Sequence, residues 1–186
     1  MIPELGHFAL ILALVLSLVQ AVVPLIGARR NSMALMAVGR PAAQGQFFFI
    51  LFSYVCLTWA FITSDFSVQL AASNSHAETP VMYKITGVWG NHEGSLLLWA
   101  MSLSLWTVAV TVFSRHLPDA FLARVLGVLG MVSAGFISFT LVTSNPFERL
   151  LPGVAEGRDL NPLLQDPGMI IHPPLLYMGY VGFSVA

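Results

Sequence analysis

Hydrophobic residues in this chain occur in long runs that short polar clusters separate. The runs 5–28, 41–64 and 95–114 contain no charged side chain, and the run 121–143 contains one, Arg124, near its start. A helix of about 20 apolar residues crosses the hydrocarbon core of a bilayer. The pattern therefore predicts four full transmembrane helices.

A fifth apolar run begins near Pro174 and is still apolar at Ala186. It contains only about 13 residues, which is too short to span a bilayer. We therefore expect 174–186 to be a truncated fifth helix, and residues 1–186 to be the N-terminal part of a longer multi-span domain. The predicted fold class is all-α, a polytopic helical membrane protein.

The composition agrees with this fold class and excludes others. The chain is 56% hydrophobic and only 9% charged, whereas a soluble domain carries roughly 25% charged residues. A net charge of −1 gives no basic surface for nucleic acid. Cys56 is the only cysteine, so the chain has no internal disulfide and no C-x-x-C-H haem-attachment motif of its own.

The distribution of basic residues predicts the orientation. The short loop 29–40 carries three arginines, and Arg115 and Arg124 flank the next loop on the same side. The two long loops, 65–94 and 144–173, carry three basic residues between them. Because basic residues accumulate in cytoplasmic loops, we expect the N-terminus and both long loops to lie outside.

The start of the fifth segment, "GMIIHPPLLYMGY", places a histidine before two prolines. Proline disfavours helical dihedrals in the residue before it, and it is well tolerated in the first turn of a helix. We therefore expect the helix to begin at about Pro174, with His172 held just before its N-terminus at the outer face. The positive helix end disfavours an imidazolium, and a neutral imidazole is what haem iron binds. The alternative is that His172 is only an interfacial anchor.

Loop 65–94 carries aromatic and polar residues next to a predicted membrane entry. The alternation around Tyr83 is compatible with a short strand or with an interfacial helix. Trp89 lies where indole rings favour the membrane interface, so an aromatic belt is one interpretation. His92 and Glu93 follow, and they either bind a metal or relay protons, or form a polar cap on the next helix.

Loop 144–173 is rich in turn signals, which predicts an ordered segment. Asn161 before Pro162 resembles the cap and first turn of a short helix, "PLLQ". Arg158 and Asp159 are adjacent in the same loop. They either pair with each other, or Arg158 contacts a carboxylate such as a haem propionate.

Four motifs in this order resemble the haem lyase family of cytochrome c maturation. They are "WGNHEGSLLLW" (89–99), "TSNPF" (143–147), "EGRDLNPLLQDPG" (156–168) and "IIHPPLLYMGYVGFSVA" (170–186). The resemblance extends over nearly the whole chain, and it does not separate the general maturation branch from the nitrite-reductase branch. It implies a multi-pass protein of the bacterial inner membrane that attaches haem to apocytochrome c, through thioether bonds, on the periplasmic face.

The resemblance also implies a site. The family holds its substrate, haem b, between two outer-face histidines, and the first lies in the H-P-P motif, which is His172 here. His172 would thus be an axial ligand of the haem iron, and Arg158 would contact a propionate. Trp89, His92 and Glu93 match "W-G-x-H-E-G" and would shape the pocket. The second histidine, a tryptophan-rich "WWD" segment and the ligands of a second, structural haem b would follow Ala186, and no catalytic residue is assigned.

The partners implied are the haem chaperone CcmE, apocytochrome-presenting proteins of the CcmH and CcmI type, an apocytochrome c with C-x-x-C-H, and membrane lipid. Two other functions compete with this one. A haem transporter would need broken helices and polar residues at the bilayer midplane, and the four full spans have no charge at mid-depth. A non-catalytic subunit of a respiratory complex would leave the two long loops without a role.

Overall fold

The computed structural model describes residues 1–114 and 116–185. Arg115, which contributed to the predicted orientation, and Ala186, the end of the expected fifth segment, lie outside the described residues. Within the described ranges the chain is all-α, and four helices are long and apolar enough to cross a membrane. The predicted all-α fold with four full spans is confirmed.

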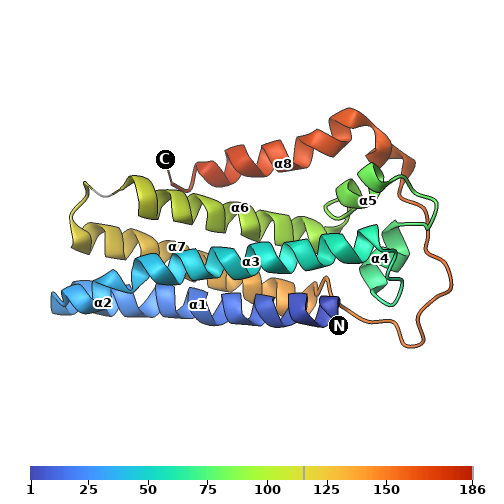
Figure 1. The fold of residues 1–186 in the computed structure, drawn as a ribbon. Helices are drawn as coiled ribbons and strands as arrows, with labels where there is room; N and C mark the ends of the chain where they lie inside the picture. The colour runs from blue at the N-terminus through green and yellow to red at the C-terminus, as the bar shows by residue number, and fades with distance from the viewer. Residues whose placement is uncertain (115, 186) are drawn as a thin grey trace.

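Four long helices and several short ones follow one another along the chain (Figure 1). In order they are α1 (Ile2–Arg30), α2 (Met33–Ala37), α3 (Gly39–Ile62), α4 (Gln69–Asn74), α5 (Val81–Gly87), α6 (His92–Phe113), α7 (Asp119–Thr143), the 3-10 helix η1 (Pro162–Gln165) and α8 (Pro167–Gly182). The segment around Tyr83 is thus a helix, which decides between the strand and helix alternatives. The short helix expected at "PLLQ" is confirmed as η1, capped by the Asn161 side chain.

The long helices form a bundle in which α1 packs against both α3 and α7, and α6 packs against α3 and α7 (Figure 1). Small residues allow this close approach. A Cβ atom added to Gly130 of α7 would lie 2.7 Å from the backbone nitrogen of Ala21 in α1. Such small residues let the backbones of membrane helices come together. The fifth apolar helix, α8, packs against α6.

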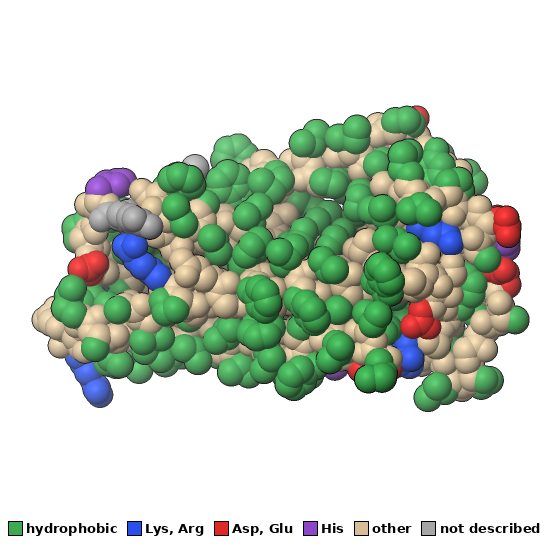
Figure 2. Space-filling model, in the orientation of Figure 1, with side chains coloured by type: hydrophobic (Ala, Val, Ile, Leu, Met, Phe, Trp, Pro, Cys, Tyr) green, Lys and Arg blue, Asp and Glu red, His purple; other side chains and the backbone are tan. Residues whose placement is uncertain are grey.

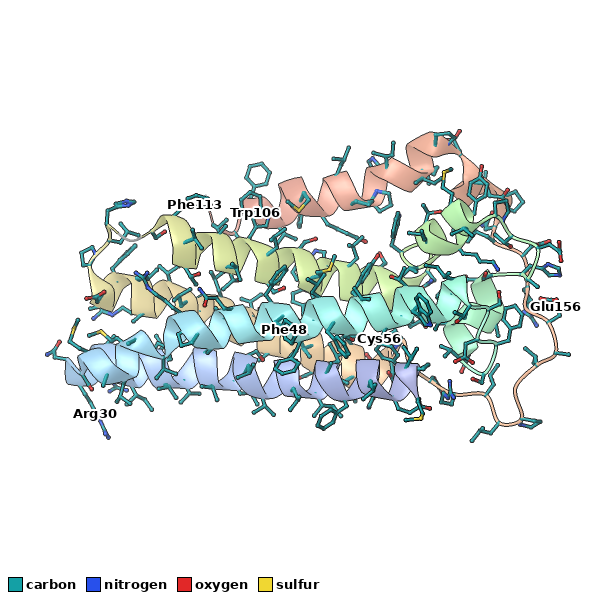
Figure 3. The ribbon with its side chains drawn as sticks, in the orientation of Figure 1. Arg30, Phe48, Cys56, Trp106, Phe113 and Glu156 are labelled. Atoms are coloured by element: carbon teal, nitrogen blue, oxygen red, sulfur yellow. The ribbon has the colours of Figure 1, made fainter. Side chains whose placement is uncertain are left out.

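The surface of the bundle is apolar in its middle and charged at its two ends (Figure 2). Large hydrophobic side chains such as Phe8, Phe48 and Phe113 are more than half exposed. Figure 3 places Arg30 and Glu156 at opposite ends of the bundle. A band of exposed apolar side chains between two charged ends is the surface that a lipid bilayer covers.

Residues 63–91 and 144–166 gather at the end of the bundle where Met1 lies, and we call these two segments the cap (Figure 1). Backbone hydrogen bonds join them: Gln69 N to Glu148 O (2.9 Å), Leu150 N to Ser67 O (2.8 Å) and Arg158 N to Ala72 O (2.8 Å). The two long loops of the sequence therefore form one ordered layer, instead of two independent connectors.

Charged side chains add to the cap. Arg149 lies 3.1 Å from Glu4 Oε1 and 3.4 Å from Asp65 Oδ2, so it links the N-terminus to both halves of the cap. Lys84 is buried, and its ammonium donates hydrogen bonds to Ser64 Oγ (2.8 Å) and to the carbonyl of Ala77 (2.9 Å). These contacts fix α5 to the rest of the cap.

The expected start of the fifth helix was wrong. α8 begins at Pro167, and Pro173 and Pro174 lie inside it. The cause is the pair Asp166-Pro167. The Asp166 carboxylate accepts hydrogen bonds from the backbone of Gly168 (2.8 Å) and Met169 (3.2 Å), and proline at the first helical position is preorganised for the helix. His172 is therefore more than one turn inside α8, where the charge effect of the helix end has faded.

Candidate functional site

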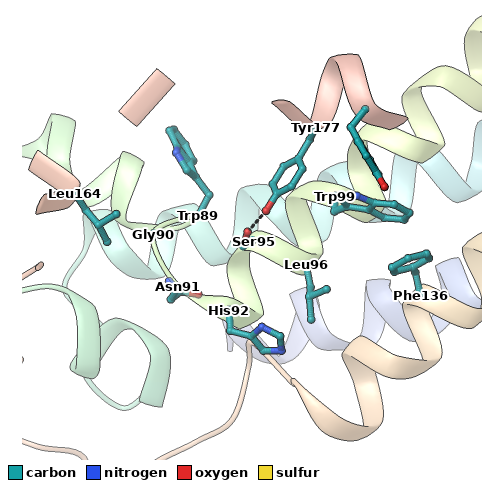
Figure 4. A pocket seen from close by; sticks show the side chains of 11 residues that line it. Trp89, Gly90, Asn91, His92, Ser95, Leu96, Trp99, Phe136, Leu164 and Tyr177 are labelled. Atoms are coloured by element: carbon teal, nitrogen blue, oxygen red, sulfur yellow. Dashed lines mark hydrogen bonds between the residues drawn. The ribbon is translucent and has the colours of Figure 1, made fainter. Parts of the chain in front are cut away.

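A pocket of about 650 Å³ opens between the first half of α6, α7, η1 and α8 (Figure 4). This volume is within the range of small-molecule sites, about 300–1,000 Å³. Aromatic side chains dominate its wall: Trp89, Trp99, Phe136, Tyr177 and Tyr180. His92 stands at the same wall (Figure 4).

The junction between α5 and α6 builds one side of this pocket. The Asn91 side chain accepts a hydrogen bond from Gly94 N (2.7 Å) and donates to the carbonyls of Gly87 (2.9 Å) and Val88 (3.2 Å). A Cβ atom at Gly94 would lie 1.7 Å from the Val88 carbonyl oxygen, so this position has no room for a side chain. The tight junction places Trp89 and His92 at the pocket wall.

Side-chain hydrogen bonds attach α8 to its neighbours along its length. The Tyr177 hydroxyl is hydrogen-bonded to the Ser95 hydroxyl of α6 (Figure 4). The indole of Trp106 donates to the carbonyl of Met178 (3.0 Å), and the indole of Trp89 donates to the carbonyl of Ile170 (3.1 Å). The orientation of α8 thus depends on a few polar contacts as well as on packing.

His172 lies on α8 outside this pocket. Its side chain is exposed, and within the described residues its ring makes no hydrogen bond or ion pair. Its exposed neighbours on the helix are apolar: Ile171, Leu175 and Leu176 are 55%, 65% and 48% exposed. The imidazole therefore stands on an open apolar face of α8.

The other residues expected at the site are divided between the pocket and the cap. Trp89 and His92 line the pocket, whereas Glu93, in the first turn of α6, is not among the described lining residues. His92 and Glu93 begin α6, as their polar-cap interpretation predicts. Arg158 is exposed in the cap, and in the described part of the chain it forms no ion pair with Asp159. The structure does not bring Arg158 to the pocket.

Sequence reasoning missed several pocket residues. Asn91 has a local signal, because an asparagine with an acidic residue in the turn that follows it is typical of a helix start. Ser95 and Tyr177 have none, since their contact joins residues far apart in the chain. Across residues 1–114 and 116–185, no group of three or more His, Cys, Asp or Glu side chains is arranged to hold a metal ion. Axial ligation of haem needs only single histidines.

Residues 89–186, which include the pocket junction, α6, α7 and α8, match the protein family described as Cytochrome C assembly protein. The chain belongs to this family. The matched region contains all four motifs on which the resemblance rests, so the resemblance is confirmed.

Relatives over the whole chain agree with the family. The chain is 62% identical to the cytochrome c-type biogenesis protein CcmF of Pseudomonas aeruginosa, over all of this chain and 28% of that protein. Identity is 53% to CcmF of Escherichia coli and 43% to NrfE of Haemophilus influenzae, over all of this chain and 29% of each relative. The chain thus spans less than a third of the length of these curated relatives.

A solved structure of similar fold carries the name CcmF, as two of these relatives do. It is described as cytochrome c heme lyase CcmF, and it matches all of this chain and 29% of its own with a TM-score of 0.85 and 26% identity. Together with the four apolar helices, these relatives identify a multi-pass membrane protein of the cytochrome c-type biogenesis family.

Proposed function

We propose that this chain forms part of a membrane haem lyase, which binds haem at the periplasmic face and promotes its covalent attachment to apocytochrome c. The family and the names of its relatives support the reaction class. The observation that carries the site is His172, an exposed imidazole on an open apolar face of α8.

The residues around His172 fit a haem edge. A neutral imidazole nitrogen is a common axial ligand of haem iron. The exposed side chains of Ile171, Leu175 and Leu176 supply apolar surface for the macrocycle. We assign Arg158, an exposed guanidinium in the cap, to a propionate, because guanidinium and carboxylate groups form strong paired hydrogen bonds.

The reaction joins two cysteine thiols of the substrate to the two vinyl groups of haem. Each thiol adds across a vinyl double bond, so a carbon–sulfur bond forms and the hydrogen passes to the other vinyl carbon. The contribution of this chain is position: holding haem and apocytochrome together raises their effective concentration. Trp89, His92 and Glu93 shape the face of the protein next to α8.

The proposed setting is the bacterial inner membrane, with the cap in the periplasm, as the arginines of the opposite end favour. The haem chaperone CcmE delivers haem b there, and partners of the CcmH and CcmI type present the apocytochrome. A second histidine for the substrate haem, and the ligands of a structural haem b, come from family segments that this chain does not cover.

The test replaces His172 in a full-length CcmF whose matching segment carries residues 1–186 of this chain. His172→Ala abolishes most cytochrome c maturation and shifts the haem spectrum away from bis-histidine coordination. Membrane insertion is unchanged, because exposed substitutions alter stability by about 0.5 kcal/mol or less. Added imidazole partly restores the His172→Gly variant, whereas His172→Lys is not rescued, since its side chain fills the site with a charge.

The matched control is His116→Ala, an exposed histidine at the opposite end of the bundle, which leaves maturation and spectrum unchanged. Normal maturation by His172→Ala, with an unchanged haem spectrum, would reduce His172 to an interfacial anchor and refute the proposed site.

A further inference from the structure

α8 carries two consecutive prolines in its interior, and these leave two helical carbonyls, those of Met169 and Ile170, without their usual donors. In an α-helix each carbonyl accepts a hydrogen bond from the N–H four residues later. Proline has no N–H, so Pro174 cannot serve the carbonyl of Ile170. The indole nitrogen of Trp89 donates to that carbonyl at 3.1 Å.

We propose that Trp89 is a positioning residue, whose indole N–H replaces the helical hydrogen bond lost at Pro174 and so holds the turn of α8 that carries His172. The positioning role of Trp89 is inferred from its hydrogen bond to Ile170 alone. Its consequence for haem binding rests on the function proposed above. A neighbouring side chain that satisfies a proline-freed carbonyl is one of the ways in which membrane helices accommodate proline.

The donor is itself held firmly. The Trp89 ring is half-buried and packs against the main hydrophobic cluster, in which Val88 and Leu97 are fully buried. The hydrogen bonds of Asn91 and the close approach of Gly94 fix the junction on either side. His172 follows Ile170 by two positions, so this hydrogen bond links the turn that carries His172 to the α5–α6 junction.

Trp106 provides a matched contrast on the same helix. Its indole donates to the carbonyl of Met178 at 3.0 Å. Position 182, four residues later, is glycine and retains its N–H. The Met178 carbonyl therefore has a helical donor in addition to Trp106. The Ile170 carbonyl has no helical donor, and the Trp89 indole takes its place.

A double-mutant cycle separates the N–H of Trp89 from its ring. Trp89→Phe keeps an aromatic ring and removes the donor. Pro174→Ala restores a backbone N–H for Ile170. If the proposal is correct, Trp89→Phe has a large effect when residue 174 is proline and a small one when it is alanine. Trp106→Phe has little effect in either background.

The first measurement does not involve haem. A nitroxide label on His172→Cys is introduced into the full-length CcmF with residues 1–186 of this chain, in a background free of other reactive cysteines. Its electron paramagnetic resonance spectrum shows greater mobility with Trp89→Phe and returns to the parent spectrum with Trp89→Phe/Pro174→Ala. An unchanged spectrum with Trp89→Phe, or no reversal by Pro174→Ala, overturns the proposal. The proposal is also overturned if Trp89→Phe and Trp89→Phe/Pro174→Ala both fail to insert into the membrane, because the indole would then act through packing.

The second measurement retains His172 and follows the haem spectrum and the yield of holocytochrome c. We expect a several-fold loss with Trp89→Phe and recovery in the double variant. If the label shows the expected mobility but the haem spectrum does not depend on His172, the positioning stands and the proposed haem site fails. If the label does not respond while His172→Ala still abolishes maturation, the haem site stands and the positioning fails.

Discussion

The bundle and the cap are held together by different kinds of contact. In the bundle of α1, α3, α6 and α7, backbones approach closely where Gly130 meets Ala21, and apolar side chains fill the space between the helices. In the cap, backbone hydrogen bonds join segments that are distant in the sequence. Polar contacts of Arg149, Lys84 and Glu156 add to them. The bundle is therefore held mainly by close packing. The cap also buries apolar residues such as Val68, Val88 and Phe147, but it depends in addition on polar groups that respond to salt and pH.

The largest effect should come from adding a methyl group where the backbones of α1 and α7 approach closely. The Cβ atom in Gly130→Ala would meet backbone atoms of Gln20 and Ala21 at 2.7–3.1 Å, and backbone atoms of a packed helix cannot rotate away. We expect a loss of about 1–3 kcal/mol in the free energy of unfolding, measured by denaturation in detergent micelles.

The control for this variant is Gly135→Ala on the same helix, where nothing lies within 4 Å of the added Cβ atom. Since alanine favours a helix over glycine by about 1 kcal/mol, this control should be neutral or stabilising. Equal losses at both positions would show that the bundle is not limited by close packing.

An intermediate effect is expected in the cap from Arg149→Gln. The substitution removes the ion pairs with Glu4 and Asp65 and leaves two carboxylates near each other. Because Arg149 is about one-third exposed, we expect a loss of about 1 kcal/mol or less, seen as faster proteolysis of the cap.

Salt distinguishes this effect from the packing effect. High ionic strength should reduce the difference in proteolysis rate between Arg149→Gln and the parent. It should not reduce the difference in the free energy of unfolding between Gly130→Ala and the parent. Arg158→Gln, exposed in the same cap, is the control and should leave proteolysis unchanged. A salt-independent Arg149 effect would contradict a polar basis for the cap.

The smallest effect concerns Glu156 and pH. Hydrogen bonds from the backbone N–H groups of Ala77 (2.9 Å) and Gly157 (3.0 Å), with nearby His76 and Lys84, lower the pKa of the Glu156 carboxyl below its ordinary value of 4.5. A carboxyl with a lowered folded pKa stabilises the fold above its unfolded pKa, and this contribution is lost as the pH falls through the folded pKa.

The measurement is pepsin cleavage of the cap as the pH falls below 4.5. Pepsin should cleave the parent faster as the pH falls through this range. Glu156→Gln has no charge to lose, so its cap should already be open to cleavage at the upper end of the range. The ratio of the two rates removes the pH dependence of pepsin itself. A constant ratio would mean that the Glu156 carboxylate does not hold the cap.

The same contrast explains which parts of the structure the sequence predicted. Long apolar runs, three without a charge and one with Arg124 near its start, predicted the four spanning helices, because only helices satisfy their own backbone groups in lipid. The start of α8 was missed because two local signals conflicted. The prolines at 173 and 174 favoured a later start, but Asp166 and Pro167 supplied a complete helix beginning, and Trp89 satisfied a carbonyl that the prolines freed.

The site was predictable only in part, for the same reason. The resemblance assigned Trp89 and His92 to the wall of a haem pocket. They line a cavity to which His172 does not contribute, so their role at haem stays a prediction. The contact between Ser95 and Tyr177, and the joining of the two halves of the cap, connect positions about 80 residues apart, so no local pattern encodes them. His172 was assigned by resemblance, and its place on an open face of α8 is a result of the tertiary structure.

The buried amine of the cap has a practical consequence. Lys84 is the only lysine in the sequence, and its nitrogen is occupied by Ser64 and Ala77. An acylating reagent reacts with a free, accessible amine, so it modifies this side chain only after α5 has separated from its surroundings. The N-terminal amine of Met1 is exposed and reacts without any opening. The rate at which the peptide that contains Lys84 gains an acyl group, read by mass spectrometry after digestion, thus measures how often the cap opens.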